Sequence, residues 1–188
     1  MTQRKSQILT TAARLFKERG YSAVTMRDLA AALDMKAASL YNHISGKQEI
    51  LTILILEVAH EFTNGMKQVE SDDSTAFVKA QNLIALHIKI ALSLTDSLAV
   101  LNNDWMHLEG VSYEEYIRLR KNYEADFKQI ILEGIDKGEF KNMSVETILF
   151  NLLSTLRSIY LWIPKKSPSE IETLKVELPD LLLLGLKK

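Results

Sequence analysis

The chain of 188 residues is predicted to be all-α, with an N-terminal three-helix domain that contains a helix-turn-helix and a larger helical domain after it. Apolar residues recur at intervals of three and four along the chain, and no stretch alternates between apolar and polar residues as a half-buried strand would. Hydrophobic residues make up 47% of the chain and charged residues 25%, which is typical of a globular protein. We expect about nine helices.

The first two helices are marked by their ends and their apolar faces. Gly20 is expected to close the first helix, because glycine readily adopts the left-handed conformation that ends many helices. Thr25 and Asp28 are spaced as a capping box, which predicts the start of a short second helix. The two apolar faces consist of Ile8, Ala12, Leu15 and Phe16 and of Met26, Leu29, Ala30 and Leu33.

A third short helix is expected after an interruption at Asp34-Met35. Its inward positions are Ala37, Leu40 and Ile44, and its outward positions are mostly small or polar. Two short helices joined by a tight turn are typical of a helix-turn-helix.

The segment Ser45-Gly46-Lys47-Gln48 is expected to open a fourth helix with a capping box. The free N–H groups of a helix start and the Lys47 ammonium would form a positive site that suits a phosphate. This helix is expected to run from Lys47 to about residue 64, and the polar stretch 70–74 then separates it from the next helix.

The charge is divided unevenly along the chain. Residues 1–50 hold eight Lys or Arg and four Asp or Glu, a net charge of +4, whereas the later residues hold fifteen and twenty, a net charge of −5. The first part is therefore where a polyanion is expected to bind. The chain has no cysteine, which excludes disulfides, thiolate metal sites and cysteine nucleophiles.

One stretch closely resembles the DNA-binding signature of the tetracycline-repressor (TetR) family. It consists of Thr25 to Ala30, Met35 to Ser39, and Leu40-Tyr41-Asn42-His43-Ile44-Ser45-Gly46-Lys47-Gln48-Glu49-Ile50-Leu51. Residues 16–21 agree with the same signature at the right spacing. The resemblance implies a DNA-binding transcriptional regulator, with a helix-turn-helix domain at residues 1–46 and a ligand-binding and dimerisation domain at 47–188.

The resemblance also implies roles for eight residues. Four would touch phosphates of a double-stranded operator, namely Thr25, Tyr41, His43 and Lys47, and four would face base edges, namely Lys36, Ala37, Ala38 and Asn42. The chemistry agrees, because an amide can bridge adenine, an ammonium reaches guanine acceptors and a methyl group packs on thymine. Lys36 and Ala38 depart from the family, which often has Ser or Thr and Gly there, so the operator sequence does not follow by analogy.

Five further helices are expected at about residues 75–94, 97–108, 113–137, 145–161 and 169–186. Ser112 with Glu115 and Ser167 with Glu170 are spaced as caps, and Pro168 occupies a position that helix starts permit. Gly138 is expected to close the long helix before it. Pro179 is expected to kink or break the last helix, because proline lacks the N–H for the bond to residue 175.

The last two helices carry more apolar surface than packing on one side requires. Their apolar residues are Ile148, Leu149, Leu152, Leu153, Leu156, Ile159, Tyr160 and Trp162, and Leu174, Val176, Leu178, Leu181 to Leu184 and Leu186. A two-fold four-helix bundle would cover this surface with one self-complementary patch, and the family resemblance implies the same use. We expect a homodimer through these helices, with a fully buried monomeric core as the alternative.

A second resemblance concerns the later part of the chain. It rests on Tyr113-Glu114-Glu115-Tyr116-Ile117, Arg120, Tyr123-Glu124, Phe127, Gly134, Gly138-Glu139-Phe140, Trp162 and Pro164. The pattern is similar to that of TetR regulators of fatty-acid and steroid-ring degradation, which implies an acyl-CoA thioester as the small-molecule effector. Basic groups would meet its phosphates and an apolar slot its acyl chain. The predicted effector residues are Trp105, Met106, Tyr116, Arg120, Tyr123, Phe127 and Leu156, for which packing in the core is the alternative role.

Two other function classes remain open, a helical di-iron enzyme and a DNA-binding protein without an effector. A di-iron site needs two Glu-x-x-His elements, and only Glu57 to His60 has this spacing. No P-loop, dinucleotide glycine motif, nucleophile elbow or zinc-type His pair is present, so we expect no catalysis, metal or cofactor. We expect a cytoplasmic protein that does not enter the membrane, because no apolar run reaches spanning length and the N-terminus does not resemble a signal peptide.

Overall fold

The computed structural model of the chain describes residues 2–188. These residues form nine α-helices, two short 3₁₀ helices and no β-strand, which confirms the predicted all-α class. They divide into two compact units: Met1–Ala59 with Leu94–Ile117, called the head unit below, and His60–Ser93 with Arg118–Lys188, called the body unit.

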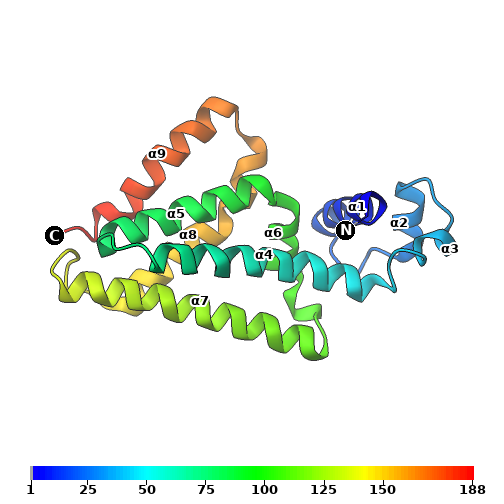
Figure 1. The fold of residues 1–188 in the computed structure, drawn as a ribbon. Helices are drawn as coiled ribbons and strands as arrows, with labels where there is room; N and C mark the ends of the chain where they lie inside the picture. Colours follow the sequence, from blue (N-terminus) through cyan, green and yellow to red (C-terminus); the bar gives the residue numbers. More distant parts are fainter. Residues whose placement is uncertain (1) are drawn as a thin grey trace. The chain divides into compact units, whose positions relative to one another are not determined.

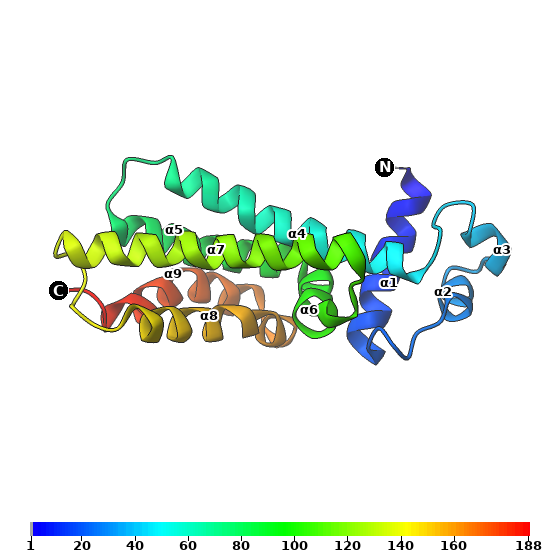
Figure 2. The ribbon, with the colours of Figure 1, turned by 90° about the horizontal axis from the view of Figure 1, so that it is seen from below.

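The head unit contains the shortest helices of the chain. It is built from α1 (Gln3–Arg19), α2 (Met26–Ala32), α3 (Ala37–Leu40), α6 (Thr95–Asp104) and the 3₁₀ helix η1 (Trp105–His107), with the first parts of α4 (Lys47–Glu70) and α7 (Gly110–Asp136). Helix α1 packs against α2 and α6, and α2 packs against α3 (Figure 2). Its core includes Ile8, Phe16, Leu29, Leu40 and Ile44, as their spacing predicts.

The body unit consists of longer helices. It holds the later parts of α4 and α7 together with α5 (Ala76–Ser93), α8 (Val145–Trp162), the 3₁₀ helix η2 (Ile163–Lys165) and α9 (Pro168–Leu184). Helix α5 packs against both α8 and α9, which lie beside it in Figure 1. Its buried side chains are almost all apolar, including Leu83, Ile84, Phe127, Leu152 and Leu156.

Several predicted helix ends are confirmed. Gly20 closes α1 with φ at 82°, and Gly138 follows α7 with φ at 71°, both in the region that favours glycine. Thr25 and Asp28 form the expected capping box at the start of α2. Ser167 and Glu170 form another at the start of α9, where Pro168 is the first helical residue.

Other predictions about helix ends are wrong. Ser112 is not a cap, because α7 already starts at Gly110. Helix α4 continues past residue 64 to Glu70, because the buried Met66 and Val69 extend its apolar face. Helix α9 is not broken at Pro179, which is buried together with Leu178 inside one continuous helix.

The fourth helix does not start with the expected capping pair. It begins at Lys47, and the carboxylate of Glu49, not the amide of Gln48, accepts hydrogen bonds from the Ser45 N–H at 2.6 Å and hydroxyl at 2.7 Å. A carboxylate is the stronger acceptor. A hydrogen bond from Lys5 and, to a lesser degree, the two bonds from Ser45 lower the pKa of Glu49 to about 2.

Among residues 2–188 no single helix is both long enough and apolar enough to cross a membrane. In the same residues, the bent helix pair Ala76–Ser93 and Thr95–His107 is long and apolar enough only when its two helices are taken together.

Candidate DNA-binding surface and effector site

A tight turn joins α2 to α3 and gives this segment its helix-turn-helix form. Asp34 adopts a left-handed conformation with φ at 51°, which aspartate tolerates better than most residues. The Met35 N–H donates to the Ala30 carbonyl at 2.9 Å, and the Ser39 N–H donates to the Lys36 carbonyl at 2.9 Å. Burial of Leu40 and Ile44 leaves the opposite side of this segment in solvent.

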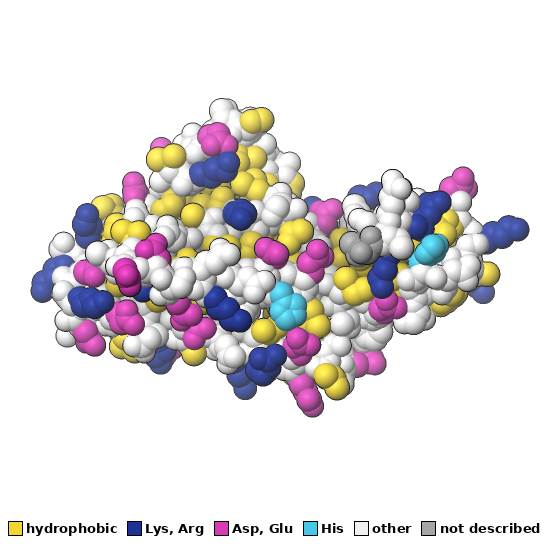
Figure 3. All heavy atoms as spheres, viewed as in Figure 1, with side chains coloured by type: hydrophobic (Ala, Val, Ile, Leu, Met, Phe, Trp, Pro, Cys, Tyr) yellow, Lys and Arg dark blue, Asp and Glu magenta, His cyan; other side chains and the backbone are white. Residues whose placement is uncertain are grey.

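The predicted base readers and two of the four predicted phosphate contacts lie in this segment. Lys36, Ala38 and Asn42 are exposed, and Ala37 is half-buried. Tyr41 is 53% exposed, although its ring is large and apolar, and His43 is half-buried. Lys and Arg side chains also face solvent around α2 and α3 (Figure 3). Contact of these residues with DNA stays a prediction.

Thr25 is exposed, but its hydroxyl has a partner. The hydroxyl donates to the Asp28 carboxylate at 2.5 Å, and the Thr25 backbone N–H donates to the same oxygen at 2.8 Å. These two bonds lower the pKa of Asp28. A DNA phosphate at Thr25 would therefore compete with a carboxylate for the hydroxyl proton.

Lys47 lies in a setting that its sequence context did not indicate. Its ammonium donates to the carbonyls of Tyr21 at 2.8 Å and Val24 at 2.9 Å, and it lies 4.1 Å from the centre of the Tyr21 ring. Burial lowers the pKa of Lys47, and the nearby Asp104 opposes that shift. Two of the three ammonium donors thus fasten α4 to the α1–α2 turn, which leaves one for a phosphate.

The same turn is linked to α6 and η1. The Tyr21 ring stacks on His107 with ring centres 5.3 Å apart, and the Tyr21 N–H donates to the Asp104 carboxylate at 3.3 Å. The Gln48 amide donates to the His107 carbonyl at 2.6 Å. Burial raises the pKa of Asp104. The α1–α2 turn, the start of α4 and η1 therefore form one polar junction, defined by these residues and Lys47.

An ion pair also joins α6 to α1. Residues 94–117 hold five Asp or Glu and no Lys or Arg, in contrast to the basic residues 1–50. Asp96 of α6 pairs with Lys17 of α1 at 2.7 Å. Sequence patterns did not reveal this pairing, because its two partners are 79 residues apart.

The seven predicted effector residues divide between the two units. In the head unit, the Trp105 and Tyr116 rings lie 5.7 Å apart, whereas Met106 is 53% exposed. In the body unit, Phe127 and Leu156 are buried. Arg120 and Tyr123 also lie in the body unit. Binding of an effector by any of the seven stays a prediction.

Arg120 and Tyr123 lie on one face of α7 with Phe127. Arg120 pairs with Glu124 at 3.2 Å, and Arg157 of α8 pairs with the same carboxylate oxygen. The Tyr123 and Phe127 rings lie 6.3 Å apart. This face of the helix therefore changes from cationic at Arg120 to aromatic at Phe127.

His87 of α5 packs beside this face of α7, and the sequence analysis did not place it there. Its Nε2 lies 2.9 Å from the Tyr123 hydroxyl, and both rings contact Phe62 of α4, with ring centres 4.6 Å and 5.6 Å away. Burial and, to a lesser degree, Arg157 lower the pKa of His87 to about 3. Burial also raises the pKa of Tyr123. Both groups are therefore neutral at physiological pH.

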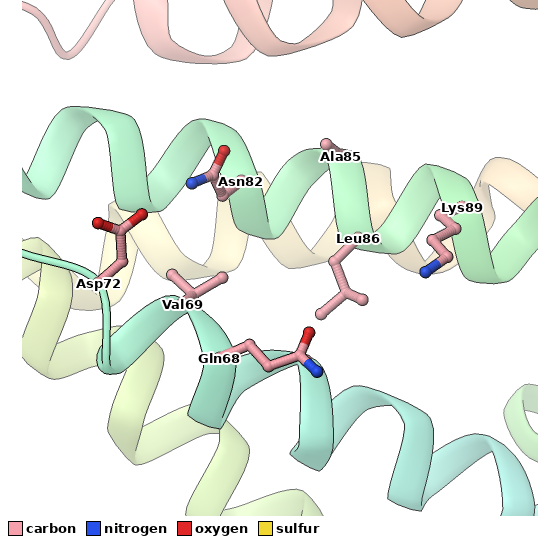
Figure 4. A pocket seen from close by; sticks show the side chains of 8 residues that line it. Gln68, Val69, Asp72, Asn82, Ala85, Leu86 and Lys89 are labelled. Atoms are coloured by element: carbon pink, nitrogen blue, oxygen red, sulfur yellow. The ribbon is translucent and has the colours of Figure 1, made fainter. Parts of the chain in front are cut away.

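A separate pocket of about 310 Å³ opens between α4 and α5 of the body unit. In Figure 4 the Leu86 side chain points from α5 toward Gln68 of α4. The lining residues are Gly65, Gln68, Val69, Asp72, Asn82, Ala85, Leu86 and Lys89. None of them belongs to the predicted effector set.

No site for a di-iron centre is found in the described part of the chain. Within residues 2–188, no three His, Asp or Glu side chains come close enough together to hold a metal ion. The element Glu57 to His60 therefore lacks the companion ligands that a di-iron site requires.

Comparison with known proteins identifies relatives of both parts of the chain. Residues 8–52 match the family described as "Bacterial regulatory proteins, tetR family", and residues 78–186 match "Tetracyclin repressor-like, C-terminal domain". The HTH-type transcriptional repressor KstR2 of Rhodococcus jostii is 22% identical over 185 residues, which cover 97% of this chain and 91% of the relative.

Two solved structures have the same fold. KstR2 of Mycobacterium tuberculosis superposes with a TM-score of 0.93 at 18% identity and covers 100% of this chain and 97% of the other. AibR, solved in complex with isovaleryl coenzyme A and operator DNA, superposes with a TM-score of 0.81 at 20% identity and covers 95% and 97%. At such identities the likeness shows the fold alone.

Proposed function

The chain belongs to the TetR family of bacterial regulatory proteins and is a DNA-binding transcriptional regulator, and we propose that it is a homodimeric repressor that an acyl-CoA effector releases from its operator. The observation that carries DNA binding is the exposure of the outer side of the segment from Lys36 to His43, while Leu40 and Ile44 are buried and anchor it. A segment of this form can enter the major groove with its polar side chains outward.

Within that segment, Asn42 and Lys36 are the readers with the strongest base-specific chemistry. Asn42→Ala is expected to cost about 1–3 kcal/mol at operators that contain its base pair and little at operators altered there. Asn122→Ala, an exposed amide on α7, is the matched control. An equal loss of affinity for all operator variants would show that Asn42 contacts the DNA backbone and not a base.

The apolar surface of α8 and α9 supports a homodimer. Phe150 and Leu161 of α8 are 74% and 60% exposed, and Leu184 of α9 is 73% exposed. Figure 3 shows hydrophobic side chains gathered on and beside α9, at the top of the view. An isologous contact would remove such side chains from water, and a two-fold dimer reads two half-sites of an operator.

Charge placed in this surface tests the dimer. Phe150→Glu with Leu184→Glu is expected to give a monomer in sedimentation and to weaken operator binding. Val111→Glu is the control, because Val111 is 79% exposed but belongs to the head unit. A double variant that remains dimeric would reject α8 and α9 as the interface. Truncation after Pro164 is expected to leave an aggregated or unfolded body unit, because the part of α5 that packs against α9 becomes exposed.

The effector assignment is supported by the chemistry of the body unit. Arg120 supplies a cation, and Tyr123, Phe127 and Leu156 supply apolar and aromatic surface within the same unit. An acyl-CoA has matching parts, since its phosphates are anionic and its acyl chain is apolar. AibR, which shares the fold, was solved with isovaleryl coenzyme A.

Titration of acyl-CoAs into the protein–operator complex tests both the ligand class and its location. Arg120→Ala is expected to raise the concentration needed for release while operator affinity without ligand stays the same. Lys89→Ala, in the pocket of Figure 4, and Arg118→Ala, on the exposed side of α7, are the controls. Sensitivity to Lys89→Ala alone would move the effector to that pocket, and no release by any acyl-CoA would reject the ligand class.

A further inference from the structure

His87 stands out from the rest of the body unit because it is polar and buried. Among the described residues of that unit, it is the one buried polar side chain other than the tyrosines. Its neighbours on the inner face of α5, Leu83, Ile84 and Ile88, are aliphatic. An aliphatic residue would therefore suit position 87 at least as well for packing alone.

The His87–Tyr123 pair uses only part of its hydrogen-bonding capacity. Removing an imidazole and a phenol from water costs free energy, which the single contact of 2.9 Å between them offsets only in part. With the proton on Nε2, His87 donates to the Tyr123 oxygen and leaves the Tyr123 O–H free to rotate toward a second acceptor. The described residues supply no such acceptor in the structure.

Chemical character changes in a fixed order along the face of α7 that carries Tyr123. Arg120 precedes Tyr123 by three residues, or about 4.5 Å of helix rise, and Phe127 follows it by about 6 Å. The order is therefore cation, hydrogen-bond donor and apolar ring. Arg157 brings a second guanidinium to Glu124, beside Tyr123. A ligand that fits this order has an anionic part, then a hydrogen-bond acceptor, then an apolar chain.

We propose that His87 and Tyr123 recognise the carbonyl oxygen of the effector, with His87 as the positioning residue and Tyr123 as the residue that donates the hydrogen bond. The proposal rests on the proposed function and deepens it, because it distinguishes an acyl thioester from a coenzyme A adduct without a carbonyl. His87 fixes the phenol through Nε2, and Tyr123 directs its proton to the thioester oxygen. The acyl chain then extends toward Phe127.

Phe62 determines how the ligand reaches the pair. Its ring contacts both His87 and Tyr123, and it is only half-buried, whereas His87 and Tyr123 are buried. An entering acyl group therefore displaces the Phe62 ring and takes over its contacts. Phe62→Leu keeps an apolar side chain but removes the ring, and is expected to speed ligand association.

A pair of coenzyme A ligands that differ only in the carbonyl tests the proposal. Octanoyl-CoA has a thioester, and S-octyl-CoA is the thioether of the same chain length. Wild-type protein is expected to bind octanoyl-CoA at least about tenfold more tightly, because a site built to hydrogen-bond a group discriminates against a ligand that lacks it. Tyr123→Phe is expected to abolish that ratio by weakening octanoyl-CoA alone. Tyr160→Phe, which alters another buried tyrosine of the body unit, is expected to preserve it.

Variants of His87 separate positioning from a structural role. His87→Leu is expected to lose the discrimination while the melting temperature is maintained or rises, because a buried polar group is removed. His87→Gln, whose amide can still bond to the phenol, is expected to restore part of the ratio. Equal binding of the two ligands by wild type, or discrimination that survives Tyr123→Phe, would overturn the proposal and leave the acyl-CoA effector intact. Failure of both ligands to bind would reject the effector class, and this proposal with it.

Discussion

The head unit combines an apolar core with polar links between its helices, whereas the core of the body unit is almost entirely apolar and joins long helices. Helices α2 and α3 have 7 and 4 residues, but α5 and α8 have 18 each. Isolated helices shorter than about 12 residues are marginal in water, so the short helices depend on their neighbours. Lys47, Gln48 and Asp96 supply such links in the head unit.

This difference bears on regulation. The polar links of the head unit join α1, the α1–α2 turn and the start of α4 to α6 and η1. A shift in η1 is therefore expected to change how the parts that flank the helix-turn-helix are held. An effector can alter DNA affinity only by favouring one of two states. Links that are partly exposed and individually weak suit such a change better than a close-packed core does.

The largest expected effect breaks the packing of the body unit. Phe127 is fully buried, so Phe127→Ala is expected to lower the free energy of unfolding by about 3–5 kcal/mol. Chemical denaturation gives the total, and amide hydrogen exchange locates the loss in the body unit. Val111→Ala, at an exposed site, is expected to change stability by less than about 0.5 kcal/mol.

The next effect breaks the polar junction of the head unit. Lys47→Met keeps the apolar stem but leaves the Tyr21 and Val24 carbonyls without their charged donor, a loss of about 1–3 kcal/mol. Amides of the head unit are expected to exchange faster, with the body unit unchanged. Operator affinity is expected to fall whether Lys47 only anchors α4 or also binds a phosphate. The slope of log operator affinity against log salt concentration becomes shallower, by about 0.9, only if Lys47 also binds a phosphate.

A third effect is the pH dependence of the stability of the body unit. Burial lowers the pKa of His87 to about 3 in the folded chain, whereas its pKa in the unfolded chain is the ordinary histidine value near 6.5. As pH falls below about 6.5, His87 therefore takes up a proton in the unfolded chain only. The contribution of His87 is therefore unchanged above that pH and falls by about 2 kcal/mol between pH 7 and pH 5. Denaturation at both pH values should show this loss in wild type and not in His87→Leu; equal losses would contradict neutral burial.

The smallest effect concerns a single surface link. Asp96→Asn removes the ion pair with Lys17, whose side chain is 31% exposed, and is expected to cost about 0.2–1 kcal/mol. The cost should shrink in 1 M salt, where screening acts over about 3 Å. Glu172→Gln, which removes an exposed pair on α9, serves as the control. A loss above 2 kcal/mol would show that Asp96 does more than pair with Lys17.

The features that depend on local interactions could be predicted from the sequence. The helical class follows from the spacing of apolar residues, and Gly20, the Thr25–Asp28 box and the Ser167–Glu170 box mark helix ends with partners a few residues away. The DNA-binding segment was identified from its family signature, and the exposure of Asn42 agrees with that prediction. In each case the physical cause lies within a single turn or a single helix.

The features that join distant residues could not be predicted, because they depend on how the helices pack. Lys47 bonds to a carbonyl 26 residues earlier, and His87 bonds to a tyrosine 36 residues later. A backbone carbonyl has no signature in a sequence, since every residue has one, and a lone histidine in an apolar helix does not specify its partner. The same limit explains why Ser112 was wrongly predicted as a cap and why α4 was predicted to be too short. The packing of other elements determines where a helix begins and ends. Long-range contacts are fixed by how helix faces meet, which local patterns do not encode.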